Sequence, residues 1–110
     1  MTNPYGLSTA ILESIVSVFQ RHPEIEQVKL YGSRAKGTYH ERSDIDLVVY
    51  GHAINRHLLA SLLMEFDESN IPYHVDLQHY EQVKNPALKD HMDRVGKTIF
   101  GQAKVARQKG

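Results

Sequence analysis

Residues 30–37 read LYGSRAKG and residues 43–50 read SDIDLVVY, and these two segments carry most of the information in the chain. An apolar run ends at Tyr31 and enters a turn at Gly32 and Ser33. After a polar link over residues 38–42, a second apolar run follows and carries Asp44 and Asp46. The pattern predicts a strand, a glycine turn and a second strand.

Asp44 and Asp46 share one face of the second strand, because successive side chains of a strand point to opposite faces. Along such a strand they lie roughly 6.6 Å apart. Two neighbouring carboxylates repel each other, and burial raises their pKa values unless a cation lies between them. Oxygen ligands that leave an ion partly open suit Mg²⁺. The pair predicts a magnesium site, and the alternative interpretation is a solvated edge of the strand.

The turn between the strands has the composition of a phosphate-binding loop. Gly32 has no Cβ, so backbone N–H groups can approach a phosphate closely, and Ser33 adds a hydroxyl at the first turn of a short helix. Arg34 and Lys36 carry positive charge that can neutralise a polyphosphate. The alternative for these two basic residues is a solvated loop, and Gly-Ser is also a common turn pair.

The rest of the chain predicts three helices and one further strand. Apolar residues at three-four spacing follow Ser8 or Thr9 and again follow Asn55, and Asn85-Pro86 suits the start of a third helix. Residues 71–77 alternate apolar and polar side chains, as expected of a strand. The order helix, strand, strand, helix, strand, helix predicts an α+β fold: a small mixed sheet with helices packed on one face and the carboxylates on the other.

Length and composition favour one domain at residues 1–101, followed by a flexible basic tail at residues 102–110. Lys plus Arg and Asp plus Glu both number 13, so no net charge attracts nucleic acid or a membrane. The chain has no cysteine, which excludes disulfides. It shows no leader sequence and no membrane-spanning run, so we expect a cytoplasmic protein.

The Gly-Ser pair, the spacer and the Asp-x-Asp motif together resemble the nucleotidyltransferase superfamily related to DNA polymerase beta. The resemblance implies a third carboxylate on a later strand, and Asp76 lies at the matching position. Asp76 is on the polar face of the strand predicted at residues 71–77, so the fold would bring it to Asp44 and Asp46. The conjunction of these motifs, rather than any one of them, carries the resemblance.

The small size of the chain is similar to that of the minimal nucleotidyltransferases, the MNT family, over about residues 8–100. Residues 94–100 look like the end of the last helix of that family. The resemblance implies an antitoxin of a HEPN/MNT toxin-antitoxin pair, which moves AMP from ATP onto a tyrosine of a HEPN-family ribonuclease toxin. It also implies a hetero-oligomer with that toxin. Because no segment is left over to bind an acceptor, we expect the partner polypeptide to complete the acceptor site.

The resemblance implies a reaction in which an acceptor hydroxyl attacks the α-phosphate of ATP in line and releases pyrophosphate. Asp44, Asp46 and Asp76 would hold two Mg²⁺ ions, and Asp76 would also take the proton. Gly32 and Ser33 would bind the β- and γ-phosphates, helped by Arg34 and Lys36. Catalysis would then consist of positioning and charge neutralisation.

Seven histidines raise the question of a second kind of metal site. They lie at positions 22, 40, 52, 57, 74, 79 and 91, and no two of them have ligand spacing within one predicted helix, so we expect no zinc site. His74 shares the predicted face of Asp76 and is a candidate for contact with nucleotide or acceptor. The alternative for His74 is an ordinary polar strand residue.

Two other functions remain open at this point. One is a non-catalytic antitoxin that neutralises its partner by binding alone, although such a protein has no need of mutually repelling acids. The other is a small-molecule nucleotidyltransferase of the antibiotic-modifying type, which the short chain disfavours.

Overall fold

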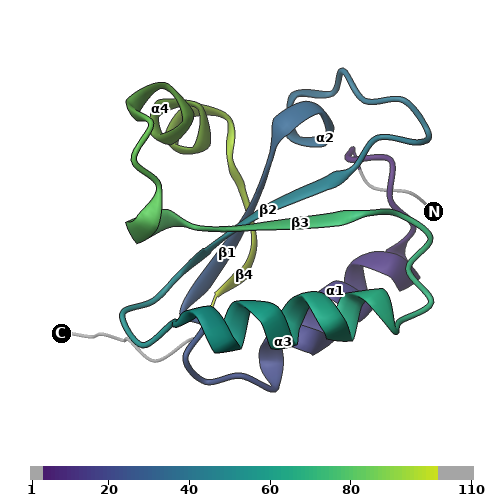
Figure 1. Cartoon of the computed structure of the whole chain (residues 1–110). Coiled ribbons are helices and arrows are strands. Elements are labelled where there is room, and N and C mark those ends of the chain that lie inside the picture. Colours follow the sequence, from purple (N-terminus) through teal and green to yellow (C-terminus); the bar gives the residue numbers. More distant parts are fainter. Residues whose placement is uncertain (1–3, 102–110) are drawn as a thin grey trace, which may run out of the picture.

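A four-stranded mixed sheet organises the chain in the computed structural model, which describes residues 4–101 (Figure 1). The helices and strands follow in the order α1 (Thr9–Gln20), β1 (Gln27–Tyr31), α2 (Gly32–Lys36), β2 (Ile45–Tyr50), α3 (Arg56–Asp67), β3 (Val75–His79), a 3-10 turn (Tyr80–Gln82), α4 (Pro86–Val95) and β4 (Lys97–Gly101). The strand order is β3-β2-β1-β4. The predicted α+β class with a mixed sheet is therefore confirmed.

The segments that connect the strands determine whether neighbouring strands run parallel or antiparallel. β1 runs antiparallel to both β2 and β4, while β2 and β3 are parallel because helix α3 crosses over between them. Parallel pairing places Asp46 opposite Asp76 in the register, and antiparallel pairing places Tyr31 opposite Asp46 on the other side. The end of β2 that carries the acids therefore lies beside both the end of β1 and the start of β3.

The predicted helix starts are confirmed by their caps. The Ser8 hydroxyl accepts a hydrogen bond from the Ile11 N–H, and the Asn55 side chain does the same for Leu58. At α4 the Asn85 side chain accepts from two backbone N–H groups, and a proline occupies the first turn. Each cap provides an acceptor for helical N–H groups that have no partner within the helix.

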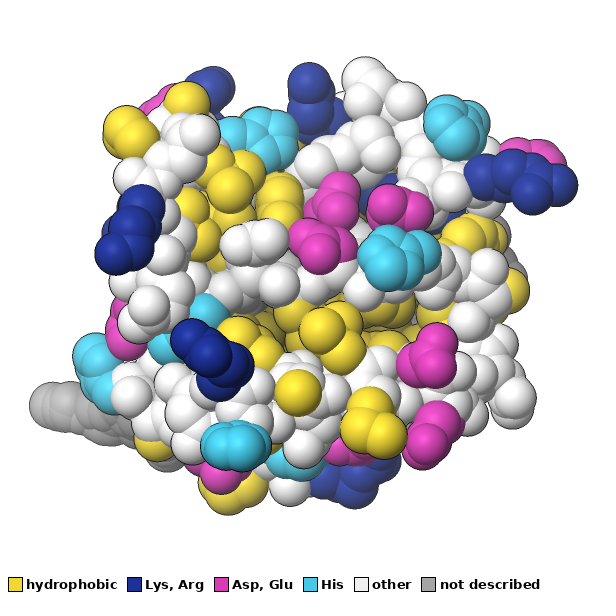
Figure 2. All heavy atoms as spheres, in the orientation of Figure 1, with side chains coloured by type: hydrophobic (Ala, Val, Ile, Leu, Met, Phe, Trp, Pro, Cys, Tyr) yellow, Lys and Arg dark blue, Asp and Glu magenta, His cyan; other side chains and the backbone are white. Residues whose placement is uncertain are grey.

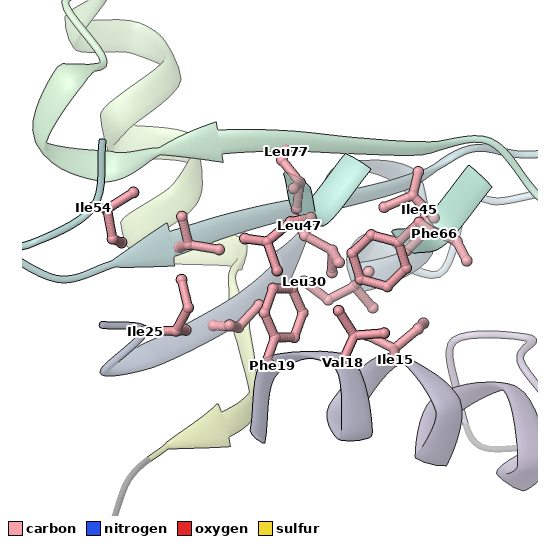
Figure 3. Packing of buried hydrophobic residues seen from close by; sticks show 14 of the residues in the cluster. Ile15, Val18, Phe19, Ile25, Leu30, Ile45, Leu47, Ile54, Phe66 and Leu77 are labelled. Atoms are coloured by element: carbon pink, nitrogen blue, oxygen red, sulfur yellow. The ribbon is translucent and has the colours of Figure 1, made fainter. Parts of the chain in front are cut away.

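The main hydrophobic core lies between the sheet and helices α1 and α3 (Figure 3). Phe19 of α1 and Phe66 of α3 meet edge to face, with ring centres 5.5 Å apart. They pack beneath the inward side chains of β1 and β2, among them Leu30 and Leu47. Burying these side chains on one face leaves their strand neighbours, including Asp46, on the opposite face.

A second, smaller core lies on that opposite face, beneath helix α4. It consists of Tyr31, Val48, Val83 and Met92. The expectation that the helices pack on one face holds for α1 and α3 but not for α4, which lies across the sheet from them (Figure 1). Met92 of α4 packs against Val48, which shares the face of Asp46. The reason is that Val48, between the acids and Tyr50, gives this face an apolar patch that the inward stripe of α4 covers.

The end of the chain differs from the prediction that residues 94–100 close the last helix. Helix α4 ends at Val95, and residues Lys97–Gly101 form strand β4 on the free edge of β1. Gly96 lies directly above Met92 O, where a Cβ would overlap that carbonyl, so the chain turns sharply at this glycine. The predicted tail at residues 102–110 lies outside the described residues.

No helix within residues 4–101 is both long enough and apolar enough to cross a membrane.

Candidate active site

Gly32 and Asp46 are in direct contact, which joins the two sequence motifs into one site. Gly32 follows β1, begins helix α2 and has a φ of +74°, a conformation that side-chain-bearing residues rarely adopt. A Cβ added here would overlap Asp46 Oδ2 and lie 3.2 Å from Asp46 Cγ. Only glycine therefore allows the backbone of the turn to lie against this carboxylate.

Asp46 and Asp76 come from neighbouring strands and lie side by side on the same face. They are register partners in the parallel β2–β3 pair, and both are partly buried. Asp44 precedes β2 by one residue and is exposed. The structure thus brings all three predicted acids to one end of the sheet, and in Figure 2 acidic side chains gather there with histidines beside them.

Burial and neighbouring negative charges act together at this site, and both raise pKa values there. Burial raises the pKa of Asp46, and the charges of Asp76 and Asp44 raise it further, while His74 and His91 oppose the shift. The pKa of the neighbouring Tyr31 hydroxyl is also raised, first by burial and then by the charges of Asp76 and Asp46. Both shifts indicate that negative charge at this end of the sheet is incompletely compensated by the protein.

These acids suit a cation whose remaining ligands are water molecules and substrate phosphates. Within residues 4–101, no group of three or more His, Cys, Asp or Glu side chains is arranged to hold a metal ion alone. Mg²⁺ is commonly bound through one or two carboxylates together with substrate phosphates and water. The Asp46–Asp76 pair beside the Gly32 turn offers carboxylate oxygens next to a place where phosphate can approach, and so fits Mg²⁺ carried by a polyphosphate.

Ser33 and Lys36, two of the other residues of the predicted phosphate-binding turn, belong to the short helix α2. Ser33 is half-buried in the first turn of α2, and its carbonyl accepts hydrogen bonds from Gly37 and Thr38. Lys36 is the last residue of α2 and is exposed. Its side chain is therefore solvent-accessible at the end of the helix that begins at Gly32.

Arg34 departs from the sequence prediction, because it lies inside the fold with 1% of its surface exposed. Its guanidinium donates through Nε and Nη2 to the Ser43 carbonyl and through Nη1 to the Tyr5 carbonyl. The rings of Tyr39 and Tyr73 lie 5.3 and 4.5 Å from the guanidinium carbon. Arg34 thus ties the loop before β2 to the N-terminal segment, and a contact with nucleotide phosphate finds no support in its position.

Two histidines border the acids, and sequence reasoning identified only one of them. His74 is exposed at the start of β3, and its carbonyl accepts a hydrogen bond from the Ile45 N–H. His91 lies on α4, and its Nε2 accepts a hydrogen bond from the Gly32 N–H at 3.2 Å. The sequence indicated only that His91 comes directly before Met92, which is buried. No neighbouring residue indicated that His91 would contact Gly32.

A groove of about 490 Å³ lies between α3 and β3 and ends at His74. Apolar side chains form much of its wall, including Leu63, Met64 and Ile71. Leu63 and Met64 are the large hydrophobic residues most exposed in the described part of the chain. In Figure 2 apolar side chains occupy a hollow below the acidic cluster. Neither Gly32 nor any of Asp44, Asp46 and Asp76 lines this groove, so it is not the site of the motifs.

The protein-family model described as "Polymerase beta, Nucleotidyltransferase" matches residues 13–105. A search of curated proteins found no match.

Solved structures with a similar fold include several toxin-antitoxin complexes. A toxin-antitoxin crystal structure with AMP-PNP gives a TM-score of 0.69 and 24% identity, over 83% of this chain and 73% of the other. A complex of tri-AMPylated Shewanella oneidensis HEPN toxin with MNT antitoxin gives 0.66 and 18%, over 89% and 76%. The MntA-HepT toxin-antitoxin structure gives 0.65 and 18%, over 88% and 75%. At these identities the likeness concerns the fold.

Proposed function

This chain belongs to the polymerase beta nucleotidyltransferase family, and from that premise we propose that it transfers AMP from ATP to a hydroxyl group of a HEPN-family toxin and so acts as an antitoxin. The observation that carries the proposal is the convergence of the Gly32 turn with Asp46 and Asp76. Mutually repelling acids held beside a glycine-lined turn serve no evident purpose in the fold, whereas a metal-bound nucleotide uses both.

The partner and the transferred group are proposed from the similar structures. One of them contains AMP-PNP, and another contains an AMPylated HEPN toxin bound to an MNT antitoxin. The fold of this chain matches the compared chains over most of their length. We therefore propose a HEPN toxin as partner in a hetero-oligomer, ATP as the AMP donor, and a tyrosine of the toxin as acceptor.

Asp44, Asp46 and Asp76 would hold the magnesium, with two ions as expected from the sequence. When bound, magnesium offsets the charge of the phosphates and lowers the pKa of an attacking hydroxyl. The acceptor oxygen attacks the α-phosphorus, its bond to phosphorus forms, and the bond to the leaving pyrophosphate breaks. Asp76, on the edge strand β3, would accept the hydroxyl proton.

The Gly32 turn would position the polyphosphate against these acids. The Gly32 N–H and the Ser33 hydroxyl are the proposed donors to phosphate oxygens, and the exposed Lys36 supplies positive charge. Arg34 supports the site indirectly, since it fixes the Ser43 carbonyl immediately before Asp44. Its role in the proposal is therefore to position the loop rather than to bind nucleotide.

The acceptor site is proposed to be completed by the toxin. Every helix and strand described in residues 4–101 forms the sheet or packs on it, and none of them makes up a separate domain for a second substrate. A toxin that presents its own hydroxyl at the β3 edge would supply the missing wall. The edge position of β3 and the exposed His74 leave that approach open.

Incubation with a purified candidate HEPN protein, ATP and Mg²⁺, followed by intact-mass and peptide mass spectrometry, tests the proposal. An added AMP group on a toxin tyrosine, with loss of toxin ribonuclease activity, is the expected result. Stoichiometric inhibition without ATP and without added mass would establish a binding-only antitoxin instead. A parallel incubation with aminoglycosides tests the small-molecule alternative, for which modification would occur without any protein partner.

A further inference from the structure

The hydrogen bond between Gly32 and His91 links helix α4 to the turn that precedes the acids. The Gly32 N–H donates to His91 Nε2 at 3.2 Å, across 59 residues of sequence. The imidazole ring also lies edge-on to the Tyr31 ring, with centres 6.1 Å apart and planes 80° apart. Two contacts therefore fix the orientation of this histidine over the end of β1.

The hydrogen bond also determines the state of the ring. A backbone N–H can only donate, so His91 Nε2 must present a lone pair and the ring proton must be on Nδ1. In this state His91 occupies the N–H that the proposed function assigns to a phosphate oxygen. A phosphate bound at Gly32 has to replace His91 as the acceptor.

Replacement does not remove His91 from the site, because the ring remains packed against Tyr31. A phosphate oxygen bound to the Gly32 N–H would lie beside His91 Nε2, because Nε2 is bonded to that same N–H in the free protein. A shift of the ring proton from Nδ1 to Nε2 leaves the ring neutral and turns Nε2 into a donor. The need for such a donor is clear, because Arg34, the basic residue nearest to the turn in sequence, has its guanidinium bound to Ser43 and Tyr5.

We propose that His91 is a nucleotide-phosphate ligand: it accepts the Gly32 N–H in the nucleotide-free protein and donates to the phosphate that takes over this N–H. The inference rests on the proposed function, since it requires a nucleotide at the Gly32 turn. It adds helix α4 to the elements that form the site.

Binding of AMP-PNP with Mg²⁺, measured by isothermal titration calorimetry, tests the inference. His91→Phe keeps a ring against Tyr31 but has no nitrogen, so we expect its Kd to rise at least about 10-fold, as for the loss of a hydrogen bond to a charged group. His91→Gln can both accept and donate, and its Kd should stay within about 3-fold of the wild type. His57→Phe and His57→Gln, at an exposed position of α3, are the matched controls and should bind as the wild type does.

The direction of the change separates this role from a structural one. If His91 only capped the Gly32 N–H, its removal would free that N–H, and His91→Phe would bind AMP-PNP as tightly as the wild type or more tightly. That result would overturn the inference and leave the proposed function intact. A wild type that binds no AMP-PNP would overturn the proposed function, and the inference with it.

A measurement on the wild type covers the case in which His91→Phe fails to fold. In a ¹⁵N NMR titration with AMP-PNP and Mg²⁺, the Gly32 amide and the His91 Nε2 resonances should shift together, with Nε2 moving toward the value of a protonated nitrogen. A shift of the Gly32 amide with an unchanged Nε2 resonance would overturn the proposal.

Discussion

Asp46 lies between Tyr31 on one neighbouring strand and Asp76 on the other, and Asp76 is its register partner across the parallel β2–β3 pair. Side-by-side strands bring these two carboxylates together without any contribution from loops. The fold thus holds two like charges close together in the absence of a ligand. Their repulsion should lower the stability of the free protein, and this effect can be tested.

Asp46→Asn should abolish AMP transfer, by at least ~100-fold, because the variant removes charge that would stabilise the reacting phosphates. Its melting temperature without nucleotide should equal or exceed that of the wild type, since the substitution relieves repulsion from Asp76. Circular dichroism melting and the mass-spectrometric transfer assay measure the two effects. Glu68→Gln, at the exposed end of α3, is the control for loss of one acidic charge. An unfolded Asp46→Asn variant would instead indicate a structural role for this carboxylate.

The stability difference between these proteins should depend on pH. The folded-state pKa of Asp46 is raised above the ordinary value of 3.8, so the folded protein retains this proton to a higher pH than the unfolded chain. The contribution of the group is complete below pH 3.8 and is lost as the pH rises through the folded-state pKa. We expect the melting temperature of Asp46→Asn, relative to the wild type, to increase from pH 3.5 to neutral pH by roughly a few degrees. A constant difference across this range would contradict the raised pKa.

Mg²⁺ with AMP-PNP should stabilise the wild type by mass action. At a free ligand concentration of about 100 times Kd the gain is about 2.7 kcal/mol, or on the order of 10 °C in melting temperature for a domain of this size. Asp46→Asn should gain little, because it lacks a proposed ligand of the ion. Differential scanning fluorimetry provides the comparison, with Mg²⁺ alone and nucleotide alone as controls. Equal shifts in both proteins would place the nucleotide away from Asp46.

Gly32→Ala should be damaging for two separable reasons. Its φ of +74° costs roughly 1–2 kcal/mol for a residue with a Cβ, and the new methyl group would overlap Asp46 Oδ2. Gly37 is a matched control: its φ is +84°, and a Cβ there meets nothing within 4 Å. We expect Gly37→Ala to lose stability by the conformational cost alone and to keep transfer activity. Gly32→Ala should lose more stability in urea unfolding and lose transfer as well.

Arg34→Met should destabilise the fold by roughly 2–4 kcal/mol, because the buried Ser43 carbonyl and the partly buried Tyr5 carbonyl each lose a charged donor. Lys36→Met, two residues later and exposed, should change stability by less than about 0.5 kcal/mol while raising the KM for ATP. Urea unfolding and steady-state kinetics distinguish the two basic residues. A stable Arg34→Met variant with a raised KM would restore Arg34 as a phosphate ligand.

Tyr50→Phe should be neutral or stabilising. The Tyr50 hydroxyl is buried with no hydrogen-bond partner among residues 4–101, although its ring stacks on Tyr80. Burial, followed by Tyr80 and Asp93, raises the pKa of Tyr50 to about 12. Stability from this group is complete below pH 10 and falls as the pH rises toward 12, because the unfolded chain ionises first. Melting temperatures from pH 8 to 11.5 should therefore fall less steeply in Tyr50→Phe than in the wild type.

The sequence contained enough local information for most of the fold. Helix caps at Ser8, Asn55 and Asn85 act within three residues of themselves, and alternation along residues 45–50 fixes which side chains face the core. The face shared by Asp46 and Asp76 follows from the same alternation once the strands are paired.

The features that the sequence did not predict depend on distant partners. Strand β4 forms because β1 offers a free edge, and its adjacent Ile99 and Phe100 lack the alternation by which a strand is recognised. Arg34 is buried by carbonyls and rings from other segments, so its local context gave no sign of burial. His91 meets Gly32 only because α4 folds back over the end of β1.

The contact between Gly32 and Asp46 has a consequence for anyone who wishes to redesign this protein. A larger residue at position 32 needs a smaller one at position 46, so Gly32→Ala combined with Asp46→Gly should recover the stability lost to the overlap with Asp46 Oδ2, but not the stability lost to the φ of +74°. The recovered protein would have neither an open turn nor a carboxylate. At positions 32 and 46, a second substitution that restores stability therefore cannot restore AMP transfer.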